Sequence, residues 1–141
     1  DPTKKMSKSD GNERSTLFLS DSDDAIRSKI KIAVTDSGSD IRFDEQNRPG
    51  VSNLITLYHT ATGKNFKEIE QEFIGLGYGE FKEAVGEAMV VMMRPIRERF
   101  FELRQDTQLL HSLLAKGAET ARSRARKTVR KVYKKIGFVE L

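Results

Sequence analysis

Apolar residues three or four positions apart run through most of this chain after residue 20, and this spacing constrains the fold more than any other feature. A repeat near 3.6 residues places such side chains on one face of an α-helix, whereas a strand would alternate them at every second residue. Clusters of Gly, Pro, Ser and Asp separate the apolar segments. The pattern therefore predicts a mainly α fold in which helices are joined by turns.

Capping signals set the boundaries of the first four predicted helices. Ser20-Asp21-Ser22-Asp23 opens the first helix, and its buried face is expected to comprise Ile26, Ile30, Ala33 and Val34. A polar loop with at most one short extended piece is expected between Asp36 and Gly50. Further helices are predicted from Val51 to Gly63, from Asn65 to near Gly75, and from Glu80 past Leu103.

The end of the chain is predicted to form two more helices and carries its positive charge. Asp106 is expected to cap a short leucine-rich helix, and Gly117 to separate it from a basic helix that ends at Gly137. Residues 116–141 hold 9 Lys and Arg against 2 Asp and Glu, whereas the first 115 residues hold 16 against 19. An apolar stripe on the basic helix predicts that one face packs on the domain and that the rest presents positive charge to solvent.

Two functions fit this basic helix. Arg122, Arg126, Arg130 and Lys134 follow one another at four-residue spacing, so they share one side of a helix and suit the phosphate backbone of a nucleic acid. The same charges equally suit a solvated surface that keeps the protein in solution. Helical spacing alone leaves both functions open.

Composition and residue placement argue against several kinds of site. The chain has no cysteine, which excludes disulfides and thiolate metal sites and fits a reducing compartment such as the cytoplasm. Met89, Met92 and Met93 lie in an apolar stripe without histidine partners, so they are expected in the core rather than at a metal. His59 and His111 fall on different predicted helices. We therefore expect no protein-bound metal, and no segment resembles a membrane span or a signal peptide.

The front of the chain holds its one candidate for catalysis, the string Lys5-Met6-Ser7-Lys8-Ser9. Lysine ammonium groups supply mobile positive charge, and hydroxyls supply directional donors, a combination that suits a polyphosphate. Asp10-Gly11-Asn12 follows as a turn signal. A solvated, disordered tail is the alternative that this polar composition allows.

The string resembles the second signature motif of the class I aminoacyl-tRNA synthetases. Later strings resemble the bacterial-type tryptophanyl-tRNA synthetases, in the same order along the chain and more closely than the related tyrosyl enzymes. These strings are Ala33-Val34-Thr35-Asp36-Ser37, Ile41-Arg42-Phe43-Asp44, Pro49-Gly50-Val51-Ser52-Asn53-Leu54, Gly77-Tyr78-Gly79 with Phe81-Lys82, Arg97-Glu98-Arg99, Val132-Tyr133 and Ile136-Gly137-Phe138.

The resemblance implies the C-terminal portion of a homodimeric, cytoplasmic ligase. Such an enzyme condenses tryptophan with ATP and Mg²⁺ to tryptophanyl-adenylate and then transfers the aminoacyl group to tRNA(Trp). The resemblance assigns the ATP phosphates to the signature loop, with Lys8 first and Lys5 second as catalytic contacts, and with Ser7, Ser9 and Met6 completing the loop. The other signature motif and the tryptophan pocket belong to a part of the family's fold that these residues do not include, so the isolated chain is expected to be inactive.

The resemblance also predicts a domain organisation. Residues 1–36 would be the end of a Rossmann-type α/β catalytic domain that is otherwise absent. Residues 37–50 would be the loop that connects this domain to the next one. Residues 51–141 would form a helical bundle that binds the tRNA anticodon region. Two other functions stay open at this point, namely a non-catalytic helical module that binds RNA and a helical adaptor whose basic end binds an acidic partner.

Overall fold

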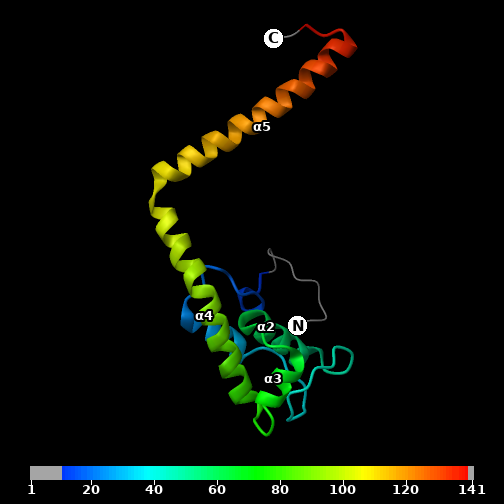
Figure 1. Cartoon of the computed structure of the whole chain (residues 1–141), viewed down its shortest axis with the longest axis vertical. Coiled ribbons are helices and arrows are strands. Elements are labelled where there is room, and N and C mark those ends of the chain that lie inside the picture. The colour runs from blue at the N-terminus through cyan, green and yellow to red at the C-terminus, as the bar shows by residue number, and fades with distance from the viewer. Residues whose placement is uncertain (1–10, 140–141) are drawn as a thin grey trace. The chain divides into compact units, whose positions relative to one another are not determined.

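The computed structural model describes residues 11–139, and every regular element within that range is helical. A short 3-10 helix, η1 (Glu13–Ser15), precedes the helices shown in Figure 1, which are α1 (Asp23–Lys31), α2 (Pro49–Thr62), α3 (Phe66–Glu72), α4 (Tyr78–Gln105) and α5 (Thr107–Ile136). The predicted mainly α fold class is confirmed. The chain divides into two compact units, of which the first ends at Glu98 and the second begins at Arg99, so α4 contributes to both.

A single hydrophobic core holds the first unit together. Its fully buried side chains come from α1, α2, α3 and the first part of α4, and include Ile26, Leu54, Ile69, Phe81 and Val90. Removing each such side chain from water contributes roughly 1.5–3 kcal/mol. Met89 and Met93 are also buried there, as the apolar stripe predicted. The core therefore ties the helix before the polar loop to the helices that follow it.

Most of the predicted helix ends are confirmed by their caps. The Ser22 hydroxyl accepts a hydrogen bond from the backbone N–H of Ala25 at the start of α1. Asn65 and Glu68 form a reciprocal capping box at the start of α3. Gly63 ends α2 with a φ of 75°, a left-handed conformation that glycine adopts without steric cost. Local side-chain chemistry thus fixes where these helices begin and end.

The predicted buried face of α1 was wrong at its last position. α1 ends at Lys31, and Val34 beyond it is 63% exposed, whereas Ile26 and Ile30 are buried. The chain leaves the helix there because Val34 and Thr35 run over the start of α2, where a Cβ on Gly50 would collide with the Val34 carbonyl group. Val34 therefore lies in the loop after α1 and does not belong to the buried face of the helix.

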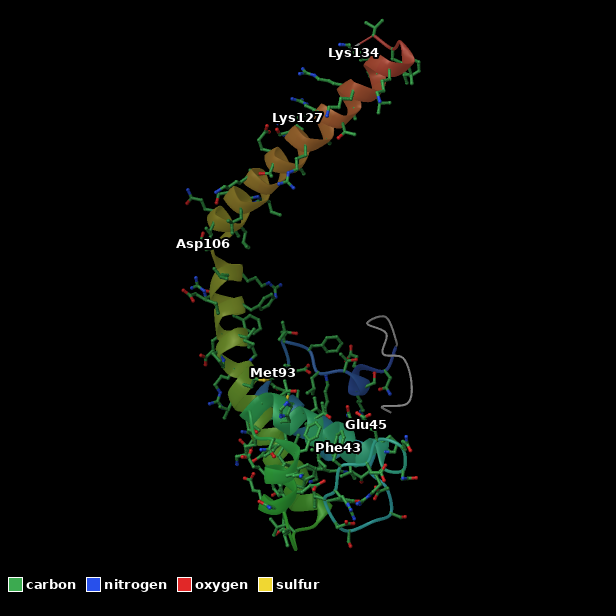
Figure 2. All side chains as sticks on the ribbon, turned by 45° about the vertical axis from the view of Figure 1, so that its right-hand side comes forward. Phe43, Glu45, Met93, Asp106, Lys127 and Lys134 are labelled. Carbon is green, nitrogen blue, oxygen red and sulfur yellow. The ribbon has the colours of Figure 1, made fainter. Side chains whose placement is uncertain are left out.

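The end of the chain forms one helix, where two were predicted. α5 runs through Gly117, which does not adopt the left-handed conformation that would end a helix, whereas Gly137 does and caps α5. No residue of α5 is buried, and Leu114 and Val132 are 71% and 47% exposed, so the expected packing of one of its faces on the domain stays a prediction. Figure 2 shows the side chains of Lys127 and Lys134 extending away from the α5 ribbon.

α4 and α5 are long helices, of 28 and 30 residues. Because either length suffices for a bilayer, polarity decides whether such a helix can cross one. Charged residues recur along both, and within residues 11–139 no helix is apolar enough for a membrane span.

Candidate functional site

The predicted phosphate-binding residues Lys5, Met6, Ser7, Lys8 and Ser9 lie outside the described residues. The described chain begins two residues after them, and Asn12 caps η1 by accepting a hydrogen bond from the Arg14 N–H at 3.1 Å. The Ser15 N–H also donates to the Asn12 carbonyl at 3.0 Å. The described chain therefore begins with a capped turn.

Lys29 on α1 holds the segment that follows η1. Its ammonium group donates to the Thr16 carbonyl at 2.9 Å and to the Asp21 carboxylate at 2.6 Å. It also lies 4.7 Å from the centroid of the Phe18 ring, within range of a cation–π contact. The side chains of Lys29 and Asp21 are each only 14% exposed. The contacts fold residues 16–21 over one partly buried lysine.

Arginines of α4 hold the same region from a second side. Arg97 donates to the Asp21 carbonyl at 2.7 Å and pairs with the Asp23 carboxylate, and Arg94 pairs with Asp23 at 2.6 Å. Hydrogen bonds from Arg94 and then Arg97 hold the pKa of Asp23 below its usual value. The start of α1 is therefore fastened to α4 by charge-assisted hydrogen bonds, all within the first unit.

A cavity of about 600 Å³ lies beside this segment. Residues 14–17 form part of its wall together with Leu57 of α2, Met92 and Ile96 of α4, and the end of α1. The position of the segment after η1 therefore helps to set the shape of this cavity.

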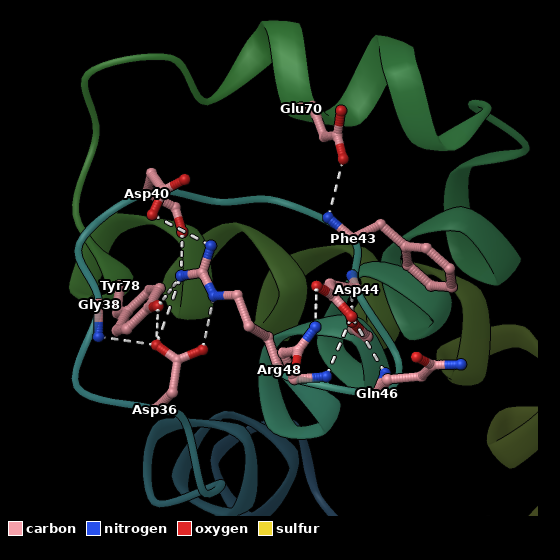
Figure 3. Close-up of polar contacts among 11 residues, drawn as sticks. Asp36, Gly38, Asp40, Phe43, Asp44, Gln46, Arg48, Glu70 and Tyr78 are labelled. Carbon is pink, nitrogen blue, oxygen red and sulfur yellow. Dashed lines mark hydrogen bonds and ion pairs between the residues drawn. The ribbon is translucent and has the colours of Figure 1, made fainter.

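A second polar cluster is centred on Arg48, the residue immediately before α2 (Figure 3). Its guanidinium pairs with the carboxylates of Asp36 at 2.7 Å and Asp40 at 3.0 Å. It also donates to the Asp40 carbonyl at 2.7 Å and to the hydroxyl of Tyr78 on α4, and that hydroxyl donates to Asp36. One arginine thus joins the loop after α1, the start of α2 and the start of α4.

The charges of this cluster favour one protonation state at neutral pH. The Arg48 guanidinium, helped by the Tyr78 hydroxyl and the Gly38 N–H, holds the pKa of Asp36 well below its usual range. Burial raises the pKa of Tyr78, and its hydrogen bond to Asp36 raises it further. Asp36 is therefore ionised and Tyr78 neutral near pH 7, which suits the cluster to holding the loop rather than to exchanging protons.

Asp44 and Glu70 fix the rest of the same loop. The carboxylate of Asp44 accepts hydrogen bonds from the backbone N–H groups of Gln46 and Asn47, and the Asp44 N–H donates to the Ser52 hydroxyl at 2.8 Å. The Glu70 carboxylate of α3 accepts from the Phe43 N–H at 2.8 Å (Figure 3). The loop is therefore bonded to both α2 and α3.

The predicted nucleic-acid-binding residues all lie on α5 and are exposed, namely Arg122, Arg126, Arg130 and Lys134. Because α5 is one continuous helix, residues four apart drift by only about 40° per step and keep to one side. Arg122 also pairs with Glu119 at 2.9 Å, with both side chains more than half exposed. The four side chains are thus exposed, and Glu119 already neutralises part of the Arg122 charge.

Sequence reasoning missed the two polar clusters. Asp36 and Tyr78 lie within strings that carry the family resemblance, but they are 42 residues apart and no local pattern links them to Arg48. No motif or regular spacing in the sequence marks Lys29 as the centre of the other cluster. Side chains that are far apart in the sequence become hydrogen-bond partners only when the helices pack, so the sequence alone does not reveal them.

Comparisons with known proteins agree on one family. The family model described as "tRNA synthetases class I (W and Y)" matches residues 1–94, about two thirds of the chain. The tryptophan–tRNA ligases of Halalkalibacterium halodurans and Listeria monocytogenes are 43% and 44% identical over 138 residues, which is 98% of this chain but 42% and 41% of theirs.

A solved structure points the same way. The crystal structure of tryptophanyl-tRNA synthetase from Mycoplasma pneumoniae matches with a TM-score of 0.74 and 30% identity, over 99% of this chain and 44% of that one. The chain thus spans about two fifths of the length of the relatives that it matches.

Proposed function

This chain belongs to the class I tRNA synthetase family (W and Y), and we propose that it is the C-terminal part of a tryptophan–tRNA ligase. The observation that carries the proposal is the identity above 40% with tryptophan–tRNA ligases along nearly the whole chain. The signature string at residues 5–9 supports the same assignment.

In the proposed reaction, a carboxylate oxygen of tryptophan attacks the α-phosphorus of ATP, and the bond from that phosphorus to the bridging oxygen breaks. Pyrophosphate leaves with Mg²⁺, and a hydroxyl of the terminal tRNA ribose then displaces AMP from the adenylate. Lys8 and Lys5 would contact the phosphates and stabilise the charge that develops on the leaving group, with Ser7, Ser9 and Met6 in the same loop. Charges placed in advance in this way lower the barrier by several kcal/mol.

The proposed roles of the domains follow the boundaries predicted from the sequence. Residues 1–36 would belong to the catalytic domain, and residues 37–50 would be the loop that connects it to the second domain. Residues 51–141 would bind the anticodon region of tRNA(Trp). The exposed basic side of α5, with Arg122, Arg126, Arg130 and Lys134, supports the last assignment. We further propose that the full-length protein is a cytoplasmic homodimer, in keeping with the resemblance and with the absence of cysteine.

The isolated chain is expected to form no adenylate. Two lysines placed on a loop stabilise a transition state only where a pocket holds the reacting groups in line, and the relatives are more than twice as long as this chain. Pyrophosphate exchange by the 141-residue chain at the rate of the full-length protein would contradict this expectation.

The test is amino-acid-dependent exchange of labelled pyrophosphate into ATP by the full-length protein that contains this sequence. We expect exchange with tryptophan and at least about 100-fold less with tyrosine, because a site that hydrogen-bonds one side chain discriminates strongly against another. Exchange with tyrosine alone would reassign the chain within the family. Exchange with neither amino acid would leave the non-catalytic RNA-binding module as the better account.

A further inference from the structure

Lys29 directs its side-chain contacts to one short segment of the chain. The Thr16 carbonyl, the Asp21 carboxylate and the Phe18 ring all lie within residues 16–21. Asp21 reinforces the same turn, because its carboxylate accepts the Phe18 N–H at 2.9 Å and its own N–H donates to the Phe18 carbonyl at 3.0 Å. An ammonium group with three donors on a flexible stem can serve these partners together.

The anchored segment lies close in sequence to the signature string. Seven peptide units separate Ser9 from Thr16, and η1 occupies three of the residues between them. An extended chain covers at most about 3.5 Å per residue, and a 3-10 turn only about 2 Å. Thr16 and Ser9 are therefore joined by a short stretch of chain.

We propose that Lys29 and Asp21 are positioning residues for the signature loop, which they act on by fixing the turn of residues 16–21 that follows it closely in the sequence. This inference rests on the proposed function, since it concerns the same phosphate-binding loop. Neither residue needs to contact ATP, because Lys29 is already committed to protein partners. Arg97 of α4 donates to the Asp21 carbonyl and supports the same turn.

The kinetic test uses the full-length protein with Lys29→Met, which keeps the aliphatic stem and removes the ammonium group. We expect kcat for tryptophan-dependent pyrophosphate exchange to fall at least about tenfold, with KM for tryptophan changed less than about twofold, because the loop acts in the transition state. Lys29→Arg retains the charge and donors and should recover at least half of the lost kcat. Should Lys29→Met not fold, Asp21→Asn removes the charge of the other partner and should lower kcat in the same way.

A double-mutant cycle with Lys8→Ala separates positioning from general destabilisation. If Lys29 acts through the signature loop, Lys29→Met should lower kcat less than about twofold once Lys8 is absent. The matched control is Lys82→Met, because Lys82 is also a partly buried lysine that donates to a backbone carbonyl, that of Ala33 at 2.8 Å, but it does not contact residues 16–21. Lys82→Met should have the same effect on kcat with and without Lys8.

Amide hydrogen exchange in the 141-residue chain tests the anchor without catalysis. Lys29→Met should speed exchange of the Phe18 and Asp21 N–H groups at least about tenfold, while Lys82→Met leaves them unchanged. The inference is overturned if Lys29→Met lowers kcat equally in both backgrounds, or if the two amides keep their protection. Absence of exchange activity in the unmutated full-length protein would instead refute the proposed function, and the amide measurement would still decide whether Lys29 anchors the turn.

Discussion

Replacing Arg126, Arg130 and Lys134 of α5 by glutamine is expected to weaken tRNA(Trp) binding and to reduce its dependence on salt. Each phosphate neutralised by a side chain contributes about 0.7–0.9 to the slope of log K against log salt concentration. Three lost contacts should therefore lower the slope by about 2–3 and weaken binding about 100-fold near 0.1 M salt. Adding Arg122→Gln should change the slope by less than about one further unit, because Glu119 already meets part of that charge.

The measurement is fluorescence anisotropy of labelled tRNA(Trp) titrated with the chain at several salt concentrations. The matched control replaces Lys127, Lys131 and Lys135 by glutamine, which removes the same charge from a side of α5 about 100° away. Glutamine is a good helix former, so neither triple change should unwind α5. Equal losses from both triples would show that only net charge matters, and no loss from either would show that the basic side is merely solvated. Displacement by polyglutamate as readily as by unlabelled tRNA would favour an acidic protein partner.

Two further predictions concern the first unit. Gly50→Ala should lower the unfolding free energy by about 1–3 kcal/mol, because the added methyl group would collide with the Val34 carbonyl group. The control is Gly79→Ala, which has open space around the added methyl group and should be neutral or stabilising. Urea unfolding followed by the near-UV circular dichroism of the tyrosines compares the two variants. Arg48→Met should cost about 2–4 kcal/mol at pH 7, because it leaves the Asp36 carboxylate without its main partner. The pKa of Asp36 is lower in the folded chain than in the unfolded chain, so its contribution to stability is present above about pH 4 and is lost as the pH falls. The difference in unfolding free energy between Arg48→Met and the unmutated chain should therefore narrow below about pH 4. A difference that stays constant with pH would contradict this cause.

Helix ends that depend on neighbouring residues could be predicted from the sequence. The capping box of Asn65 and Glu68 and the left-handed Gly63 and Gly137 follow from side-chain chemistry within a few positions. Gly117 misled the prediction because a glycine ends a helix only where the chain turns left-handed, and the apolar stripe on either side of it allowed α5 to continue. The prediction for Val34 was wrong because the chain leaves the helix before this residue and runs over α2, so the helical spacing no longer decides which side chains are buried.

Candidate site residues could be predicted only where they form a continuous string or a regular helical spacing. The string at residues 5–9 and the arginines of α5 met that condition. Arg48 and Lys29 belong to no such string or spacing. Tyr78 comes within reach of Arg48 only when α2 packs against α4, and Asp21 comes within reach of Lys29 only through the turn before α1. Hydrogen bonds between side chains 8 and 30 positions apart leave no periodic trace in a single sequence.

We propose that Lys5 and Lys8 hold the triphosphate of ATP during amino-acid activation. The direct test of this role is tryptophan-dependent pyrophosphate exchange by the full-length protein carrying Lys5→Ala and Lys8→Ala together, compared with a control that carries Lys31→Ala and Lys67→Ala on exposed helix positions. Loss of a charge-stabilising donor at such a site costs about 100- to 1,000-fold in kcat, so the double variant should retain less than about 1% of the exchange rate while the control stays within about twofold. Exchange by the double variant at the rate of the control would contradict the claim.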